Sequence, residues 1–167
     1  MCCRASLRTA AKIVFTSVVS AASCAGNTQP TTSILTMSST DGSGRTTLVD
    51  GATGGVCFNM EPRYAPGGEK IAYMCGPEDG SVQICSMNPD GSGTTLLTRT
   101  PDAVAADAHW SWDGQRLAIS RRDTSGNVNV WTMLADGSDL TQITTFTEPV
   151  EGGDVGWSLD DSQLVFE

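Results

Sequence analysis

Basic side chains are scarce in this sequence. Ten lysines and arginines stand against nineteen aspartates and glutamates, and the formal net charge at pH 7 is −9. Phosphate backbones and anionic lipid surfaces are recognised by cationic patches, so this balance argues against a nucleic-acid partner and against adsorption to a membrane through basic residues. An acidic surface fits a role in solubility or a basic partner.

Histidine is almost absent as well, since His109 is its single copy. One histidine without a G-x-S-x-G turn does not make a Ser-His-Asp arrangement, and without a C-x-x-C pair a structural zinc site is not expected. The glycine-rich segment 51–56 lacks the Lys of a phosphate-binding loop and is interpreted as a connection. We therefore predict no catalytic residue, no metal ligand and no cofactor, and interpret the chain as not an enzyme.

Long apolar runs are missing too. The longest, Ile13–Ala22, has about ten residues, which is too short to span a bilayer. Arg4, Arg8 and Lys12 precede or begin it, and no acidic residue occurs before Asp41. A positive region followed by a short apolar run is typical of a secretory signal peptide.

The end of this segment resembles a bacterial lipobox, in which small residues precede a cysteine that becomes lipidated. Here Ala21-Ala22-Ser23 precede Cys24, although the lipobox prefers Leu at the place of Ala21. We predict a signal peptide over 1–24 with lipidation of Cys24; plain cleavage near Ala22 is the alternative. Residues 25–33 are small and polar, as in a flexible tether. The protein is thus expected to be exported, as a periplasmic or membrane-anchored lipoprotein, and to meet a membrane only through that anchor.

Apart from the anchor candidate Cys24, three cysteines remain after the predicted signal peptide, Cys57, Cys75 and Cys85, an odd number for a disulfide framework. Cys75 and Cys85 flank one predicted hairpin loop, but their predicted registers are about three rungs apart, which disfavours bonding geometry. We therefore favour small buried side chains over a bridge between them.

Two sets of residues recur along the chain. Asp-Gly turns are separated by 49 and then 46 residues, and aromatic residues by 46 and then 47. Asp-Gly between apolar runs is a strong hairpin signal, because Gly adopts the positive φ of the turn without steric cost. A period in this range indicates a repeat architecture. The turns are Asp41-Gly42, Asp90-Gly91 and Asp136-Gly137, and the aromatic positions are Tyr64, Trp110 and Trp157.

One copy of the repeat shows four short β-favouring runs. The first ends near Trp110, and the others cover Arg116–Arg121, Val128–Leu134 and Leu140–Thr145. Four-stranded antiparallel units in tandem are typical of propeller blades. A single β-sandwich explains the turns but not the recurring Trp-Ser-x-Asp-Gly, seen here as Trp110 to Gly114 with Asp113.

These motifs resemble the TolB-like, WD40-like propeller repeat of bacterial envelope proteins. The resemblance rests on Trp110-Ser-Trp-Asp-Gly114, Leu117-Ala118, Met87–Gly93 and Leu97-Thr98, and it covers about 34–167. Where the family has Pro in its Ser-Pro-Asp-Gly turn, this chain has Trp112 and Leu159. The first copy reads Ala65-Pro66-Gly67-Gly68 and lacks the Asp.

The predicted fold is all-β: a partial β-propeller with about three blades' worth of four-stranded antiparallel units in an incomplete ring. It comprises an outer half-blade (34–49), two whole blades (about 61–98 and 107–145) and an inner half-blade (154–166). Closed propellers need four to eight blades. Either the sequence is a piece of a longer protein, which we favour, or copies self-associate through open blades.

Several residues are assigned structural roles in preference to functional ones. One Asp per Asp-Gly turn is too few for calcium, so ordinary hairpins are expected. Glu61, Asp107 and Asp154 precede the aromatic position and are expected to accept backbone hydrogen bonds near the channel mouth, where His109 is a core or wall residue. The tryptophans are expected to pack between blades, with one exposed as a partner anchor as the alternative; they are Trp110, Trp112, Trp131 and Trp157.

The resemblance implies a periplasmic component that contacts outer-membrane lipoproteins. We predict a non-catalytic binding or scaffold module of the bacterial cell envelope with a protein partner. One alternative is the propeller portion of a larger enzyme, a prolyl-oligopeptidase-like peptidase or a polysaccharide lyase, whose catalytic part is absent from this chain. Another is a structural repeat protein that self-associates, because a fold does not determine a function.

Overall fold

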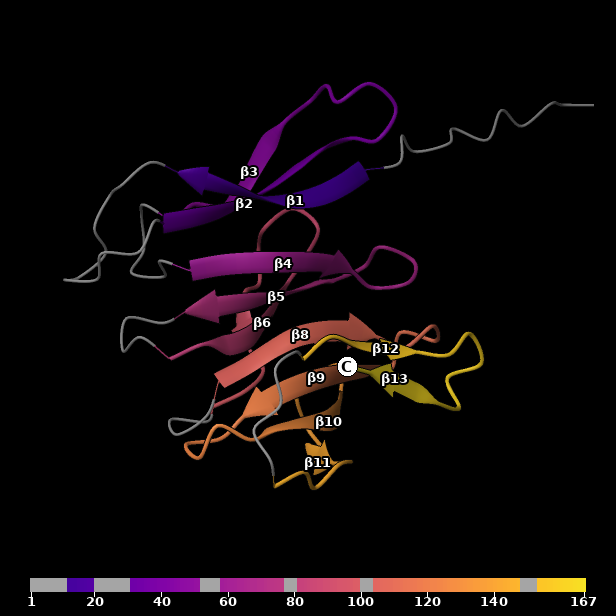
Figure 1. Cartoon of the computed structure of the whole chain (residues 1–167). Helices are drawn as coiled ribbons and strands as arrows, with labels where there is room; N and C mark the ends of the chain where they lie inside the picture. Colours follow the sequence, from indigo (N-terminus) through magenta and orange to yellow (C-terminus); the bar gives the residue numbers. More distant parts are fainter. Residues whose placement is uncertain (1–11, 20–30, 52–57, 77–80, 100–103, 148–152) are drawn as a thin grey trace, which may run out of the picture.

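A computed structural model describes residues 12–19, 31–51, 58–76, 81–99, 104–147 and 153–167. Every regular element in these ranges is a β-strand, and neighbouring strands within each sheet pair antiparallel (Figure 1). Within the same ranges, no helix has the length and apolar character needed to cross a membrane.

The strands form four sheets in chain order. Sheet 1 contains β1 (Lys12–Val19), β2 (Thr31–Ser38) and β3 (Thr46–Val49). Sheet 2 contains β4 (Phe58–Tyr64), β5 (Ile71–Gly76), β6 (Gln83–Met87) and β7 (Thr95–Leu96). Sheet 3 contains β8 (Val104–Trp110), β9 (Arg116–Arg122), β10 (Val128–Leu134) and β11 (Thr141–Gln142). Sheet 4 contains β12 (Val155–Trp157) and β13 (Leu164–Phe166).

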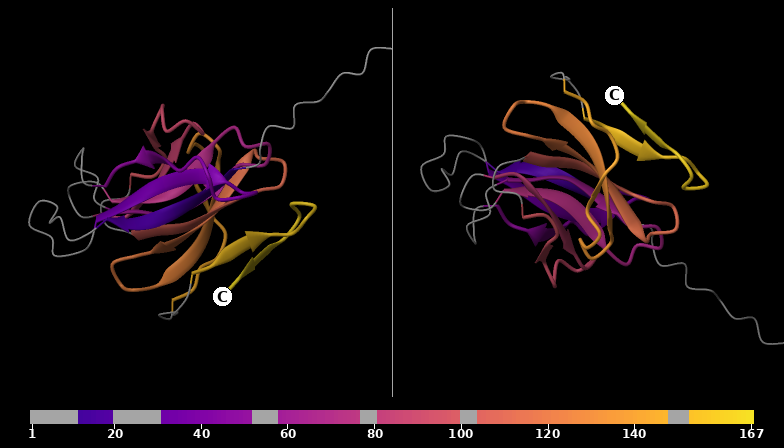
Figure 2. Two further views of the ribbon diagram at one scale, coloured as in Figure 1. Left: turned by 90° about the horizontal axis from the view of Figure 1, so that it is seen from above. Right: turned by 90° about the horizontal axis from the view of Figure 1, so that it is seen from below.

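The core lies between the sheets. Ile84 and Leu97 of sheet 2 pack with Leu117, Ile119 and Met133 of sheet 3 in one buried cluster. A second cluster joins sheet 1 to sheet 2, and a third joins sheet 3 to sheet 4. Each sheet therefore buries its neighbour's apolar face, and the stack fans out without closing (Figure 2). The predicted partial β-propeller is confirmed.

The first sheet departs from the sequence prediction in two ways. β2 begins at Thr31, inside the predicted tether, and Thr31, Thr32 and Ser33 are buried. The apolar run of the predicted signal peptide forms β1, which pairs with β2 from Lys12↔Ser38 to Val19↔Thr31. Its valine, isoleucine and threonine residues are strong strand formers. Thus β1 lies beside β2 in sheet 1 as β5 lies beside β6 in sheet 2 and as β9 lies beside β10 in sheet 3.

Cys24 and residues 25–30 lie outside the described residues, as do residues 52–56 of the glycine-rich segment. Removal of the signal peptide and lipidation of Cys24 therefore stay predictions.

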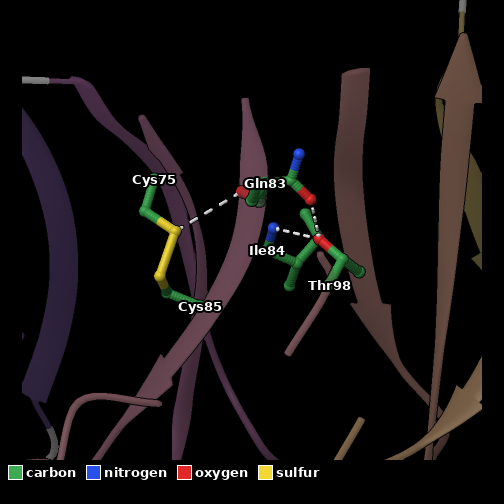
Figure 3. Close-up of a disulfide and its surroundings, with 5 residues drawn as sticks. All are labelled: Cys75, Gln83, Ile84, Cys85 and Thr98. Carbon is green, nitrogen blue, oxygen red and sulfur yellow. Dashed lines mark hydrogen bonds between the residues drawn. A yellow bond between two sulfur atoms is a disulfide. The ribbon is translucent and has the colours of Figure 1, made fainter. Parts of the chain in front are cut away.

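The expectation of free thiols at Cys75 and Cys85 is wrong, because a disulfide joins them. In the β5–β6 hairpin Cys85 pairs with Tyr73, two residues from Cys75, so both cysteines lie on one face as diagonal neighbours. Their Cα atoms are 5.9 Å apart, within the usual disulfide range. The bridge lies on the side of the hairpin that faces sheet 1, whereas Ile84 lies on the opposite side (Figure 3).

Candidate functional site

The three Asp-Gly turns use their carboxylates internally. Each Asp Oδ1 accepts hydrogen bonds from the backbone N–H and the hydroxyl of the serine two residues later, over 2.6 to 3.0 Å. These bonds lower the pKa of Asp41, Asp90 and Asp136. The carboxylates therefore stay ionised at neutral pH while they hold the turns.

The glycines of two turns also touch the preceding sheet. A Cβ on Gly91 would lie 2.7 Å from the carbonyl oxygen of Leu48, and one on Gly137 would lie 2.7 Å from that of Leu97. Both glycines have a φ of 87°. Each hairpin thus reverses the chain and also packs against the last strand of the preceding sheet or the residue that follows it.

The Trp-Ser-x-Asp-Gly turn is held by a network of its own. Asp113 Oδ1 accepts from the Ser111 hydroxyl at 2.7 Å and from the Gln115 N–H at 2.9 Å. The Arg116 N–H donates to Ser111 Oγ at 2.9 Å, and Gly114 has a φ of 71°. Ser158 and Asp160 repeat the serine–aspartate bond in sheet 4.

The signature tryptophans connect neighbouring sheets. Trp110 Nε1 donates to the carbonyl oxygen of Arg63 at 3.2 Å, and Trp157 Nε1 donates to that of His109 at 3.1 Å. In both cases the acceptor directly precedes the aromatic position of the previous repeat. The Arg121 guanidinium lies over Trp131, and its Cζ atom is 4.4 Å from the centroid of the tryptophan ring.

Asp161 makes a further link between sheets that sequence reasoning missed. Its carboxylate accepts from the backbone N–H of Trp112 at 2.7 Å and from that of Asp113 at 3.0 Å. It stands where the previous repeat has Gly114, and its φ is 55°. The available signal was the replacement of Gly by Asp, a residue that tolerates this conformation.

Two apolar side chains remain exposed on these turns. Trp112 is 57% exposed and Leu159 is 80% exposed, at equivalent places in successive turns. The corresponding residue of sheet 2, Pro66, is also exposed. We call Pro66, Trp112 and Leu159 the apolar turn row. It lies where β4, β8 and β12 end, at the right of Figure 1.

Acidic residues gather where the inner strands bulge. Glu61 and Asp107 have φ of 51° and 54°, at the register shifts of β4 and β8. Asp107 Oδ2 accepts from the Ser120 hydroxyl at 2.9 Å, a side-chain partner where backbone donors were expected. Partial burial, followed by a hydrogen bond to Asp107 and that residue's charge, raises the pKa of Glu61 to about 7.

His109 lies beside this group. Burial, and then the charge of Arg63, lower its pKa, while Asp154 and Asp107 oppose the shift. Arg63, His109 and Asp154 line one open groove. Among the residues that the structure describes, no three His, Cys, Asp or Glu side chains are grouped so as to hold a metal ion. What the arrangement offers is a set of rigid turns with exposed apolar tips.

Comparison with known proteins places this architecture. No protein-family model matches the chain. A curated relative, dipeptidyl-peptidase 5 of Porphyromonas endodontalis, is 36% identical over 80 residues, which are 48% of this chain and 11% of that protein.

Solved structures match more of the chain. TolB from Acinetobacter baumannii superposes with a TM-score of 0.68 and 16% identity, over 92% of this chain and 34% of that one. An oligogalacturonate lyase in complex with manganese gives 0.68 and 14%, over 92% and 43%. The chain spans less than half of these proteins, and the likeness shows that they share the β-propeller fold.

Proposed function

We propose that this open stack of TolB-like β-propeller blades is a protein-binding module of the bacterial cell envelope. The observation that carries the proposal is the exposure of Trp112 and Leu159 on two turns that hydrogen bonds join across neighbouring sheets. Aromatic and aliphatic groups on a rigid frame lose little conformational entropy on binding, so they are effective anchors.

Export to an oxidising compartment is part of the proposal. Disulfides persist outside the reducing cytosol, and Cys75 is bridged to Cys85. The layout of residues 1–24 supports the same location, and the proposed form is a lipoprotein anchored at Cys24.

The anchor is tested by expressing the full chain in a bacterial host with labelled palmitate, beside Cys24→Ser. We expect labelled protein in the membrane fraction for the natural sequence and unlabelled protein for the variant. Equal labelling of both would exclude Cys24 as the anchor.

Protein binding is tested by placing a photo-crosslinking amino acid at position 112 in envelope preparations. Position 143 is the matched control, because Ile143 is 50% exposed but lies outside the turn row. A discrete adduct is expected from position 112 and not from position 143. Equal adducts at both positions, or none at either, would count against the proposal.

A second candidate is the propeller portion of a peptidase, favoured by the 36% identity to dipeptidyl-peptidase 5 over 80 residues. The two candidates separate in the coding sequence that follows residue 167 in the genome. Further repeats alone would fit the binding module. A hydrolase domain with a G-x-S-x-G turn would favour the peptidase instead.

A further inference from the structure

We infer that the apolar turn row and the carboxylates around it form a docking surface for an extended, basic peptide segment with apolar residues at every third position. This inference rests on the proposed protein-binding function and names the kind of partner that the surface fits.

The row is fixed in place by contacts between successive turns. Asp161, in the turn of Leu159, binds the backbone of Trp112 and Asp113. A Cβ on Gly114 would lie 3.8 Å from Cδ of Pro66, so the turns of Trp112 and Pro66 are in ordinary contact. The three apolar side chains therefore sit on three consecutive, touching turns.

The spacing of the sheets sets the spacing of the anchors. Packed sheets lie about 10 Å apart. A polyproline II segment is extended, rises about 3.1 Å per residue and has three residues per turn, so every third side chain lies on the same side of it. Such a segment, laid across the row, passes from one turn to the next in about three residues. An apolar side chain at every third position can meet Pro66, Trp112 and Leu159 in succession.

The charge of the surrounding turns selects a basic partner. The pKa values of four carboxyls in turns of sheets 2, 3 and 4 are lowered, chiefly by hydrogen bonds from serine residues in the same turns, so they are ionised at neutral pH. They are Asp90, Asp113, Asp136 and Asp160. Nearby, Arg116 is paired with Asp139 at 3.2 Å, and Lys70 donates to Asn88 at 2.8 Å.

A second copy of this chain is a poorer occupant of the same surface. It carries the same formal charge of −9, so two acidic turn surfaces would repel each other. A lysine- or arginine-rich segment instead satisfies the carboxylates while its apolar residues cover Trp112 and Leu159.

The test measures binding of dye-labelled nine-residue peptides to the full chain by fluorescence anisotropy. The probe has Leu at every third position and Arg or Ser elsewhere; one control replaces Arg by Glu, and another replaces Leu by Ser. We expect binding of the probe alone, weakened as salt rises, because screening reduces the attraction between charges.

Variants locate the site. Trp112→Ser and Leu159→Ser are each expected to weaken probe binding about tenfold, as for central interface anchors. Ile143→Ser, an exposed apolar residue outside the row, should leave binding unchanged. Thermal unfolding of each variant verifies that it is folded.

Absence of probe binding, equal binding of the acidic control, or equal affinity of all three variants would overturn the docking inference. So would a dimer of the full chain that Trp112→Ser dissociates. If position 112 crosslinks an envelope protein but the probe fails, the docking chemistry is wrong and the proposed function stands. If the probe binds but no envelope protein crosslinks, the proposed function fails instead.

Discussion

Single residues join the sheets of this protein, and Gly91 shows how closely. Its φ of 87° and its contact with Leu48 each disfavour a side chain, whereas Gly126 has a φ of 89° with open space around it. Alanine at either site meets backbone strain of about 1–2 kcal/mol. Alanine at position 91 also overpacks against a backbone carbonyl, for about 1–3 kcal/mol more.

We therefore expect Gly91→Ala to lower the free energy of unfolding in urea by more than Gly126→Ala does. The difference isolates the contact between hairpin and neighbouring sheet, because both variants share the strain of positive φ. An equal loss in the two variants would show that this contact contributes nothing to stability.

Glu61 gives stability a dependence on pH. Its pKa is about 7 in the folded chain, against 4.5 for an ordinary glutamate. Between these values the folded state holds a proton that the unfolded state has lost, so stability falls as pH rises from about 4.5 to 7. Because the side chain is largely exposed, solvent screening reduces the effect to about 1 kcal/mol.

Glu61→Gln should flatten this part of the profile, and Glu69→Gln, on an exposed turn, should not. The pH dependence is measured as the free energy of unfolding in urea at several pH values between 4 and 8. The lowered pKa of His109 gives a slope of opposite sign below pH 6.5, since the unfolded state then binds the extra proton. Because His109 is present in both chains, its contribution cancels when the profile of Glu61→Gln is subtracted from that of the natural chain. If the two chains had parallel profiles of stability against pH, the raised pKa of Glu61 would be contradicted.

At the scale of strands and turns, the sequence predicted what is local and missed what depends on pairing. Asp-Gly and Ser-x-Asp-Gly turns form within a few residues, so their positions could be read from the sequence. The Cys75–Cys85 bridge depends on the register of β5 against β6. The sequence suggested that the two cysteines are offset by about three residues, whereas the observed offset is two, which puts both on one face of the hairpin. The Asp161 and tryptophan links depend on how whole sheets pack, which no local pattern contains.

The disulfide should contribute measurably to stability. It closes a loop with a sequence separation of 10 residues, for which loss of chain entropy in the unfolded state predicts about 2–3 kcal/mol. Reductant should lower the urea midpoint of the natural chain to that of a Cys75→Ala/Cys85→Ala variant. The variant itself should not respond to reductant. A natural chain indifferent to reductant would mean that the bridge is absent in solution.

At the scale of the whole molecule, β1 connects the architecture with the predicted processing. It pairs with β2 and contacts β4, yet none of its described side chains is fully buried, in contrast to most of β5 and β9. A short apolar run rich in β-branched residues suits both a signal peptide and a strand. The basic residues before this run favoured the signal peptide, and the pairing of β1 with β2 was therefore not predicted. Cleavage before Cys24 would remove β1 and expose the edge of β2, with its buried Thr36.

We therefore expect a chain that begins at Cys24 to exchange the backbone amides of β2 faster than the full chain does. The amides of β9 and β10, which lie in sheet 3, should be equally protected in both, because sheets in a stack are stabilised mainly by their nearest neighbours. Hydrogen exchange read by mass spectrometry measures the two regions in one experiment. Equal protection of β2 in both chains would contradict pairing with β1, whereas loss of protection throughout would mean that the first sheet stabilises the whole stack.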